Sequence, residues 1–380
     1  MLHLRQLARA TALGVLSLPL PALALEAGGL DFTGTGFMTL AAGRVLSGTH
    51  DASVDQGFRC PCFISDYAQR GVYESGQWRA GPDSRLGLQG TVSAAQGRFA
   101  LTGQAVARGA ANGAADLEWL YATAELSGNL TAQIGRKRLP LFSYSEAQDV
   151  GFALPWVHLP PQLYGWEIVN YDGASLVWRE QWGAWGSAVQ VFGGNETRHD
   201  SGYWQIYNGK FSRTDVRWSD ILGTEVTLSR DWLTLRAVRI QSYTQNKVVS
   251  LGETAFSDRK RQVIQGLSMG VDSGNWFARG EFLYINRTQD YGKDYANLIA
   301  VGYRHGPWQP LLSRSDYRQQ LDTAGVPERH GTWSAVLRYD LTEESALKVQ
   351  ADVWTDKTEP GFGSLHGDAR LLTISYDRVF

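Results

Sequence analysis

The segment that decides the fold is TWSAVLRYDLTEESALKVQADVWT, residues 332–355. In both of its halves the odd-numbered positions are mostly apolar, whereas polar or charged side chains such as Arg338 and Asp352 occupy even-numbered positions. Side chains that alternate with a period of two belong to β-strands whose two faces meet different environments. The four residues Thr342–Ser345 between the halves predict a tight turn, so we expect a β-hairpin here.

The same alternation, interrupted by turn residues, recurs from residue 30 to the last residue. Its connections alternate between short turns and longer loops, as in an outer-membrane barrel with tight periplasmic turns on one rim. A soluble β-sandwich would not show this asymmetry. The sequence therefore predicts an all-β fold, a transmembrane antiparallel β-barrel of 16 strands with both termini at the periplasmic rim. The predicted strands are 30–42, 84–93, 99–107, 117–126, 130–135, 174–180, 185–192, 221–229, 232–243, 262–271, 276–286, 295–304, 308–317, 332–341, 346–355 and 369–380.

Composition argues against a helical membrane protein. Beyond the N-terminal region there is no run of about 18 apolar residues, which is near the minimum for a transmembrane helix. The mean hydropathy of −0.27 is compatible with a membrane barrel, because only alternate residues of such a barrel face lipid.

The first 24 residues have the layout of a signal peptide. Arg5 and Arg9 precede an apolar run over residues 10–20, and Ala22-Leu23-Ala24 is a small-x-small cleavage site. We expect cleavage after Ala24, which leaves residues 25–380 as one barrel domain; the apolar run is too short to favour the alternative of a membrane anchor. Cleavage removes two of the 36 basic residues and none of the 38 acidic ones, so the net charge falls from −2 to −4 and does not suggest a nucleic-acid partner.

The chain has two cysteines, in the sequence Cys60-Pro61-Cys62. Export to an oxidising compartment favours a disulfide between them. A metal site is the alternative, but it would need further ligands, and no histidine lies nearby in the sequence. We therefore expect a disulfide that stiffens a long loop, and no metal.

One interruption of the strand pattern is long and rich in aromatic residues. The excursion over residues 139–172 contains the acids Glu146 and Asp149, four prolines and many aromatic side chains. A connection of this length without clear structure of its own is uncommon in a compact domain and is usually functional. We expect it to fold into the lumen of the barrel and to narrow a pore.

Several short segments of the sequence resemble motifs of a known protein family. The last strand ends on Phe380, which is similar to the C-terminal signal that the barrel-assembly machinery reads in Gram-negative outer-membrane proteins. The sequence DSRLGLQG at residues 83–90, and Gly135-Arg136 before the long excursion, are similar to pore-facing motifs of the general diffusion porins.

This resemblance implies a location and a function. The location is the outer membrane of a Gram-negative cell, in contact with outer-membrane lipid and lipopolysaccharide. The function is a water-filled channel for passive diffusion of small hydrophilic solutes and ions, assembled as a homotrimer. In that family the third long loop lies inside the barrel and carries the acids.

The expected constriction sets wall arginines against acids of the excursion. It consists of Arg85, Arg136, Arg138, Glu146 and Asp149. Opposite charges on facing walls of a narrow aqueous passage create a transverse field that favours polar solutes. The alternatives are arginines at the rim that meet lipopolysaccharide, and acids that are simply solvated.

Strict alternation creates a difficulty at this point of the sequence. It places Lys137 on the face opposite Arg136 and Arg138, and it turns those two arginines toward lipid. A bulge, or the end of the strand near Gly135, would remove the difficulty.

The sequence also bears on two alternative functions, an enzyme and a selective channel. For an enzyme, the seven histidines are scattered, and no Gly-x-Ser-x-Gly, Walker or His-Glu-x-x-His motif occurs, so we expect no catalytic residues and no cofactor. For a channel selective for sugars or organic acids, Trp156, Tyr164 and Trp166 could form a stacking track.

Overall fold

The computed structural model describes residues 25–27, 29–49, 57–250, 253–287, 292–322, 325–359 and 367–380. The expected signal peptide, residues 1–24, lies outside these ranges, so its cleavage stays a prediction. None of the described helices has the length and apolar character needed to cross a membrane.

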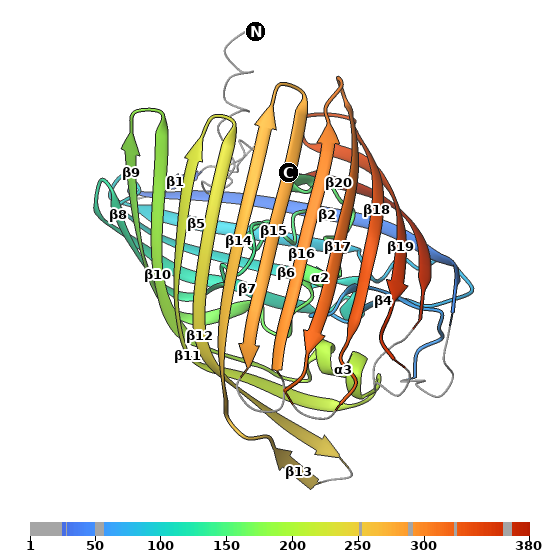
Figure 1. The fold of residues 1–380 in the computed structure, drawn as a ribbon. Coiled ribbons are helices and arrows are strands. Elements are labelled where there is room, and N and C mark those ends of the chain that lie inside the picture. Colours follow the sequence, from blue (N-terminus) through green and yellow to red (C-terminus); the bar gives the residue numbers. More distant parts are fainter. Residues whose placement is uncertain are drawn as a thin grey trace.

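A closed antiparallel barrel accounts for most of the described residues (Figure 1). Its sheet contains 18 strands, of which β1 and β13 are short additions that each pair with one neighbour. The other 16 pair in sequence order, and the pairing of β2 with β20 closes the barrel. The barrel strands are β2 (Leu30–Gly48), β5 (Arg85–Ala94), β6 (Phe99–Arg108), β7 (Ala115–Ser127), β8 (Leu130–Arg138), β9 (Asn170–Trp182), β10 (Trp185–Arg198), β11 (Arg213–Arg230), β12 (Leu233–Ser250), β14 (Lys260–Ser273), β15 (Trp276–Arg287), β16 (Gly292–Tyr303), β17 (Trp308–Gln320), β18 (Arg329–Asp340), β19 (Ser345–Asp356) and β20 (Ala369–Val379).

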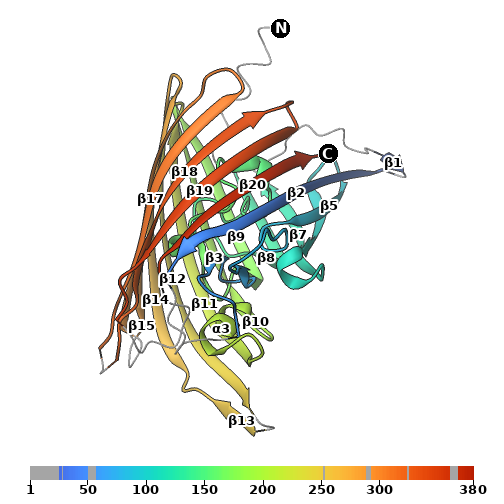
Figure 2. The ribbon, with the colours of Figure 1, turned by 90° about the vertical axis from the view of Figure 1, so that its right-hand side faces the viewer.

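Short elements decorate the barrel. They are β1 (Leu25–Ala27), β3 (Phe63–Asp66), β4 (Gly71–Tyr73), η2 (Gly109–Ala111), η3 (Gly151–Ala153), α2 (Pro161–Tyr164), α3 (Gly202–Asn208) and β13 (Glu253–Phe256). In two views the C-terminus lies at one rim, whereas α3 and β13 lie at the opposite rim (Figures 1 and 2).

All 16 predicted strands are present, so the predicted fold is confirmed. The differences lie at strand ends on the rim of the long loops. β11 begins at Arg213 instead of residue 221, and β12 runs to Ser250 instead of residue 243. At the start of β11 the alternation is inverted, with Val216 and Trp218 buried inward and Arg217 exposed, so a search for outward apolar residues does not mark this part of the strand. The short strand β13, which pairs with β12, was missed as well.

Residues 139–169, which we call the inner loop, pack against the inward face of the barrel. Helix α2 contacts β16, β17 and β18. Buried loop side chains such as Leu141 and Trp156 share one apolar cluster with wall residues such as Ile264 and Leu298. Because this wall is apolar on its inward side, covering it with the loop removes that surface from water.

Three buried cations of the wall bind backbone carbonyls of the inner loop. Arg236 comes from β12, Arg338 from β18 and Lys348 from β19. The Lys348 ammonium donates at 2.6 and 2.9 Å, and Arg338 donates at 2.6 and 3.0 Å. The accepting carbonyls belong to Pro140, Leu141, Gly151, Phe152, Leu154 and Trp156. A loop inside a barrel lacks the backbone pairing of a sheet, and these cations supply part of it.

The first long loop, which joins β2 to β5 and carries β3 and β4, packs against the inner loop. The ring of Tyr67 stacks on Tyr207 of α3, with 6.1 Å between centroids, and Phe63 contacts His158 of the inner loop at 5.4 Å. A disulfide joins Cys60 and Cys62, which pack against this aromatic cluster. The first loop is therefore fixed to both α3 and the inner loop.

His158 links the two loops to the wall. Its Nδ1 lies 2.9 Å from a carboxylate oxygen of Asp83, at the base of the first loop, and its Nε2 lies 3.2 Å from Asp352 of β19. Burial opposes a charge on the imidazole, but the two carboxylates outweigh it and raise the pKa of His158 to about 10. The histidine is therefore an imidazolium at neutral pH.

Replacing Trp156 tests the packing of the inner loop. The indole is fully buried, and its Nε1 donates to Ser313 Oγ at 3.1 Å. Trp156→Ala should lower the free energy of unfolding by about 3–5 kcal/mol, because it leaves a cavity and an unpaired hydroxyl. Urea unfolding in detergent micelles measures this, with the exposed outward Trp333→Ala as the matched control. Equal losses in the two variants would contradict the packing of Trp156 against the wall.

The pKa of His158 predicts a pH dependence. The folded pKa lies above the ordinary 6.5, so the contribution of the imidazolium to stability is complete below about pH 6.5 and is lost as pH rises through about 10. The difference in unfolding free energy between wild type and His158→Gln should therefore shrink steadily across that interval. A difference that stays constant would show that the charge on His158 does not contribute.

Candidate pore constriction

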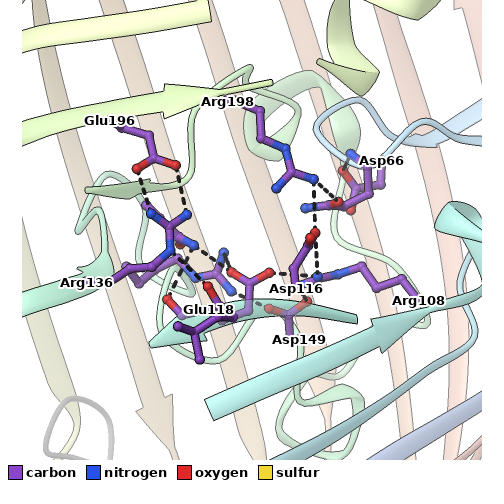
Figure 3. A network of polar contacts seen from close by, with 12 residues as sticks. Asp66, Arg108, Asp116, Glu118, Arg136, Asp149, Glu196 and Arg198 are labelled. Carbon is purple, nitrogen blue, oxygen red and sulfur yellow. Dashed lines mark hydrogen bonds and ion pairs between the residues drawn. The ribbon is translucent and has the colours of Figure 1, made fainter. Parts of the chain in front are cut away.

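Asp149 of the inner loop lies between two wall arginines. Arg108 of β6 donates to Oδ1 at 2.8 Å (Figure 3). Arg138 of β8 donates to Oδ2. Glu118 of β7 completes the group, 2.7 Å from Arg108 and 3.2 Å from Arg138. We call Arg108, Glu118, Arg138 and Asp149 the buried quartet, because each side chain is almost inaccessible to water.

The buried quartet is electrically balanced. Burial disfavours the carboxylate of Asp149, but Arg108, Arg138 and Arg85 outweigh burial and hold its pKa below the ordinary value. Two arginines and two carboxylates cancel in net charge, so the quartet joins the inner loop to the wall and contributes little net field to the lumen.

The structure brings together three of the five residues expected at the constriction. Arg138 and Asp149 are in direct contact. Arg85 of β5 acts electrostatically on Asp149 but makes no hydrogen bond or ion pair among the described residues, and its Nε and Nη2 are buried without a partner.

The other two expected residues lie apart from the quartet. Arg136 binds the carboxylate of Glu196 through two hydrogen bonds of 2.8 Å and reaches Asp172 at 3.2 Å. Glu146 is exposed on the inner loop and makes no ion pair within the described part of the chain. Glu146 and Asp149 thus have different environments: Asp149 is neutralised by two arginines, and Glu146 is exposed.

Gly135 precedes the three basic residues of β8 and has a φ of +132°. A Cβ at this position would lie 2.2 Å from the carbonyl oxygen of Leu120, so the backbone requires glycine. Neither the expected bulge nor the expected strand end is found near Gly135, since β7 and β8 pair without a register shift there and β8 continues to Arg138; the local irregularity is the positive φ of Gly135.

Lys137 lies on the same side as Gln133, as alternation predicts; its ammonium donates to Gln133 and reaches Ser175 at 3.2 Å. Arg138 departs from alternation, because it is paired with Asp149 of the inner loop instead of facing lipid.

Lys137 and Glu146 form the unneutralised part of the site. Glu146 supplies the largest attraction that acts on the Lys137 ammonium, and it also acts on Tyr121 and Tyr171. Lys137 makes no ion pair with any described residue, and its Nζ lies 5.5 Å from the ring centroid of Tyr121. A buried ammonium without an ion pair among the described residues and an exposed carboxylate therefore attract each other between the inner loop and strands β7–β9.

Sequence reasoning missed Arg108, Glu118 and the role of Lys137. Arg108 is the last residue of β6, one position beyond the predicted strand. Glu118 follows a register shift between Gln104 and Ala105, which moves it out of the alternation of β7. A bulge moves a side chain to the other face, so period two alone could not assign Glu118 inward.

Comparison with known proteins shows the fold. No family model and no curated protein matches the chain. A loop L8 deletion mutant of OmpT, an outer membrane protein of Vibrio cholerae, matches with a TM-score of 0.60 at 9% identity, over 93% of this chain and 100% of that one. OmpF of Salmonella typhi, in complex with daunomycin, matches with 0.58 at 10% identity, over 94% and 100%. The outer membrane channel DcaP of Acinetobacter baumannii matches with 0.56 at 11% identity, over 93% and 99%. The chain thus has the closed 16-stranded barrel fold of outer-membrane porins.

Proposed function

We propose that the protein is an outer-membrane channel through which small hydrophilic solutes and ions diffuse passively. The observation that carries the proposal is the position of the inner loop. The loop is fixed to the apolar inward face of strands β12–β18, and its exposed acid Glu146 is directed to the opposite side of the lumen. This arrangement narrows a lumen instead of leaving it wide, as a size-limited channel requires.

The inward face opposite the loop is polar. Gln89 and Gln104 are hydrogen-bonded at 3.0 Å, Thr91 and Thr102 at 3.1 Å, and Gln133 reaches Thr123 at 3.4 Å. Amide and hydroxyl groups replace part of the hydration of a passing solute without selecting one structure. This lining favours many small hydrophilic solutes over a single one.

The aromatic side chains considered for a selective channel do not support that alternative. Trp156, Tyr164 and Trp166 are buried in the cluster between loop and wall. A stacking track needs exposed ring faces, and these rings are covered by protein.

The outward face supports a position in a membrane. Large apolar side chains such as Leu267 and Ile299 are more than 60% exposed. At the rim of short turns, Trp276 packs on Tyr303 and Trp308 on Tyr339, as aromatic belts do at a membrane interface. We place the barrel in the outer membrane of a Gram-negative cell, inserted by the barrel-assembly machinery through the strand ending at Phe380.

We place the homotrimer contact on the outward face of β5–β10. A broad apolar depression of about 720 Å³ lies there, lined partly by the small residues Ala122, Ala124, Ala132 and Ala174. Small side chains let neighbouring barrels approach closely in lipid.

Replacing Glu146 or Lys137, which make no ion pair among the described residues, tests the channel. Glu146→Gln should shift the ion permeability ratio toward anions by about three-fold, because one charge a few ångströms from a hydrated ion contributes roughly 0.7 kcal/mol in water. Lys137→Gln should shift it toward cations by a similar factor. Reversal potentials of single channels under a salt gradient measure both. A folded barrel without conductance would contradict the proposed function.

Asp149→Asn removes one negative charge, as Glu146→Gln does, so the two variants can be compared directly. Asp149→Asn removes one of the two acids that Arg108 and Arg138 share, and breaking such a buried pair lowers stability by about 3–5 kcal/mol. Urea unfolding should therefore separate Asp149→Asn from Glu146→Gln, which should stay close to wild type. If both variants lose the same stability, Asp149 does not fasten the loop.

A further inference from the structure

A group of exposed arginines lies on the outer face of the barrel, near the rim of the long loops. We call Arg217, Arg239, Arg259 and Arg261 the outer arginine patch; Arg217 belongs to β11, Arg239 to β12 and Arg261 to β14. The register places the patch around Tyr243, which pairs with Ser219 on one side and with Arg261 on the other. Arg239 is two outward positions from Tyr243 on the same strand.

The outer arginine patch has an excess of positive charge. Arg259 stacks on Tyr243, 4.0 Å from the ring centroid, and is paired with Asp220. Arg261 donates to the side-chain oxygen of Gln241 at 3.0 Å.

The other two arginines have no such partners. Arg217 and Arg239 make no hydrogen bond or ion pair in the part of the chain that the structure describes. The acid nearest to Arg217 along β11 is Asp215, which is occupied by His199 at 3.2 Å and Lys247 at 4.0 Å. Two guanidinium groups therefore remain available to a ligand.

An apolar groove begins directly beside the patch. Ala237 and Leu267, which pair with each other, are the next outward positions after Arg239 and its partner Gln265. They open a groove of about 600 Å³ on the outward face. Its apolar lining comprises Val226, Leu228, Leu235, Ala237, Leu267, Met269, Phe282 and Ile299.

We propose that the outer arginine patch and this groove bind one phosphorylated lipid, with the phosphate on the arginines and an acyl chain in the groove. Guanidinium groups match the geometry of phosphate oxygens and bind them through paired hydrogen bonds. A free phosphate ion would use the arginines but not the groove, whereas a neutral lipid would use the groove but not the arginines. Basic residues beside a membrane-facing apolar surface match a ligand that has both a phosphate group and an acyl chain.

Native mass spectrometry of the full chain, released from non-ionic detergent, tests the proposal. The probe is dimyristoyl phosphatidic acid, compared with dimyristoyl phosphatidylcholine and inorganic phosphate. Arg217→Gln/Arg239→Gln removes two charges that make no hydrogen bond or ion pair among the described residues. It should weaken binding of phosphatidic acid by about thirty-fold, since each basic residue near a membrane surface contributes about five-fold.

The matched control is Arg44→Gln/Arg370→Gln. These arginines are exposed on the neighbouring strands β2 and β20, and they also make no hydrogen bond or ion pair among the described residues. Ala237→Trp fills the groove without changing charge, and it should weaken binding of the lipid as well. Circular dichroism before release verifies that each variant is folded.

Three results would overturn the proposal. Unchanged binding by Arg217→Gln/Arg239→Gln would exclude the arginines as the phosphate site. An equal loss in Arg44→Gln/Arg370→Gln would reduce the effect to overall charge. Displacement of the lipid by inorganic phosphate, together with unaltered binding by Ala237→Trp, would indicate a site for a free anion.

Discussion

The structure depends on the contacts between buried wall cations and the backbone of the inner loop. Lys348 is fully buried, and its ammonium is satisfied by two loop carbonyls and by Asp377 at 3.1 Å. A charge in this position is tolerated only with such complete pairing, since an isolated buried ion is strongly unfavourable. Neither part has all its polar groups paired without the other. The inner loop needs hydrogen-bond donors for its carbonyls, and the buried cations of the wall need acceptors.

This dependence separates the charges of the lumen into two kinds. Asp149 and Glu118 are matched by Arg108 and Arg138, and they fasten the loop. The exposed carboxylate of Glu146 forms no ion pair among the described residues, so its electrostatic field extends into the lumen. Two acidic residues of the same loop, Glu146 and Asp149, thus differ: Asp149 has a structural role, whereas we propose that Glu146 acts on passing ions.

The sequence predicted the barrel well and its interior less well. Strand alternation located all 16 barrel strands because the membrane imposes opposite environments on the two faces of a strand. Of the residues expected at the constriction, the structure brings Arg138 into contact with Asp149. The sequence could not show that Arg136 is bound to Glu196 instead, because that contact joins residues 60 positions apart. Arg108 and Glu118 were missed because one lies beyond the predicted strand and the other behind a bulge.

Loss of alternation nevertheless carries information about the interior. In β16 the inward Ala296, Leu298 and Ala300 are buried, although the outward Ile299 and Val301 are exposed, so the strand is apolar on both faces. An inward apolar face in contact with lumen water would be unfavourable by roughly 25 cal/mol for each square ångström. A pore strand of this kind therefore requires a cover, and here the cover is the inner loop. Where a barrel strand ceases to alternate in mid-membrane, its sequence indicates which side of the wall the loop occupies.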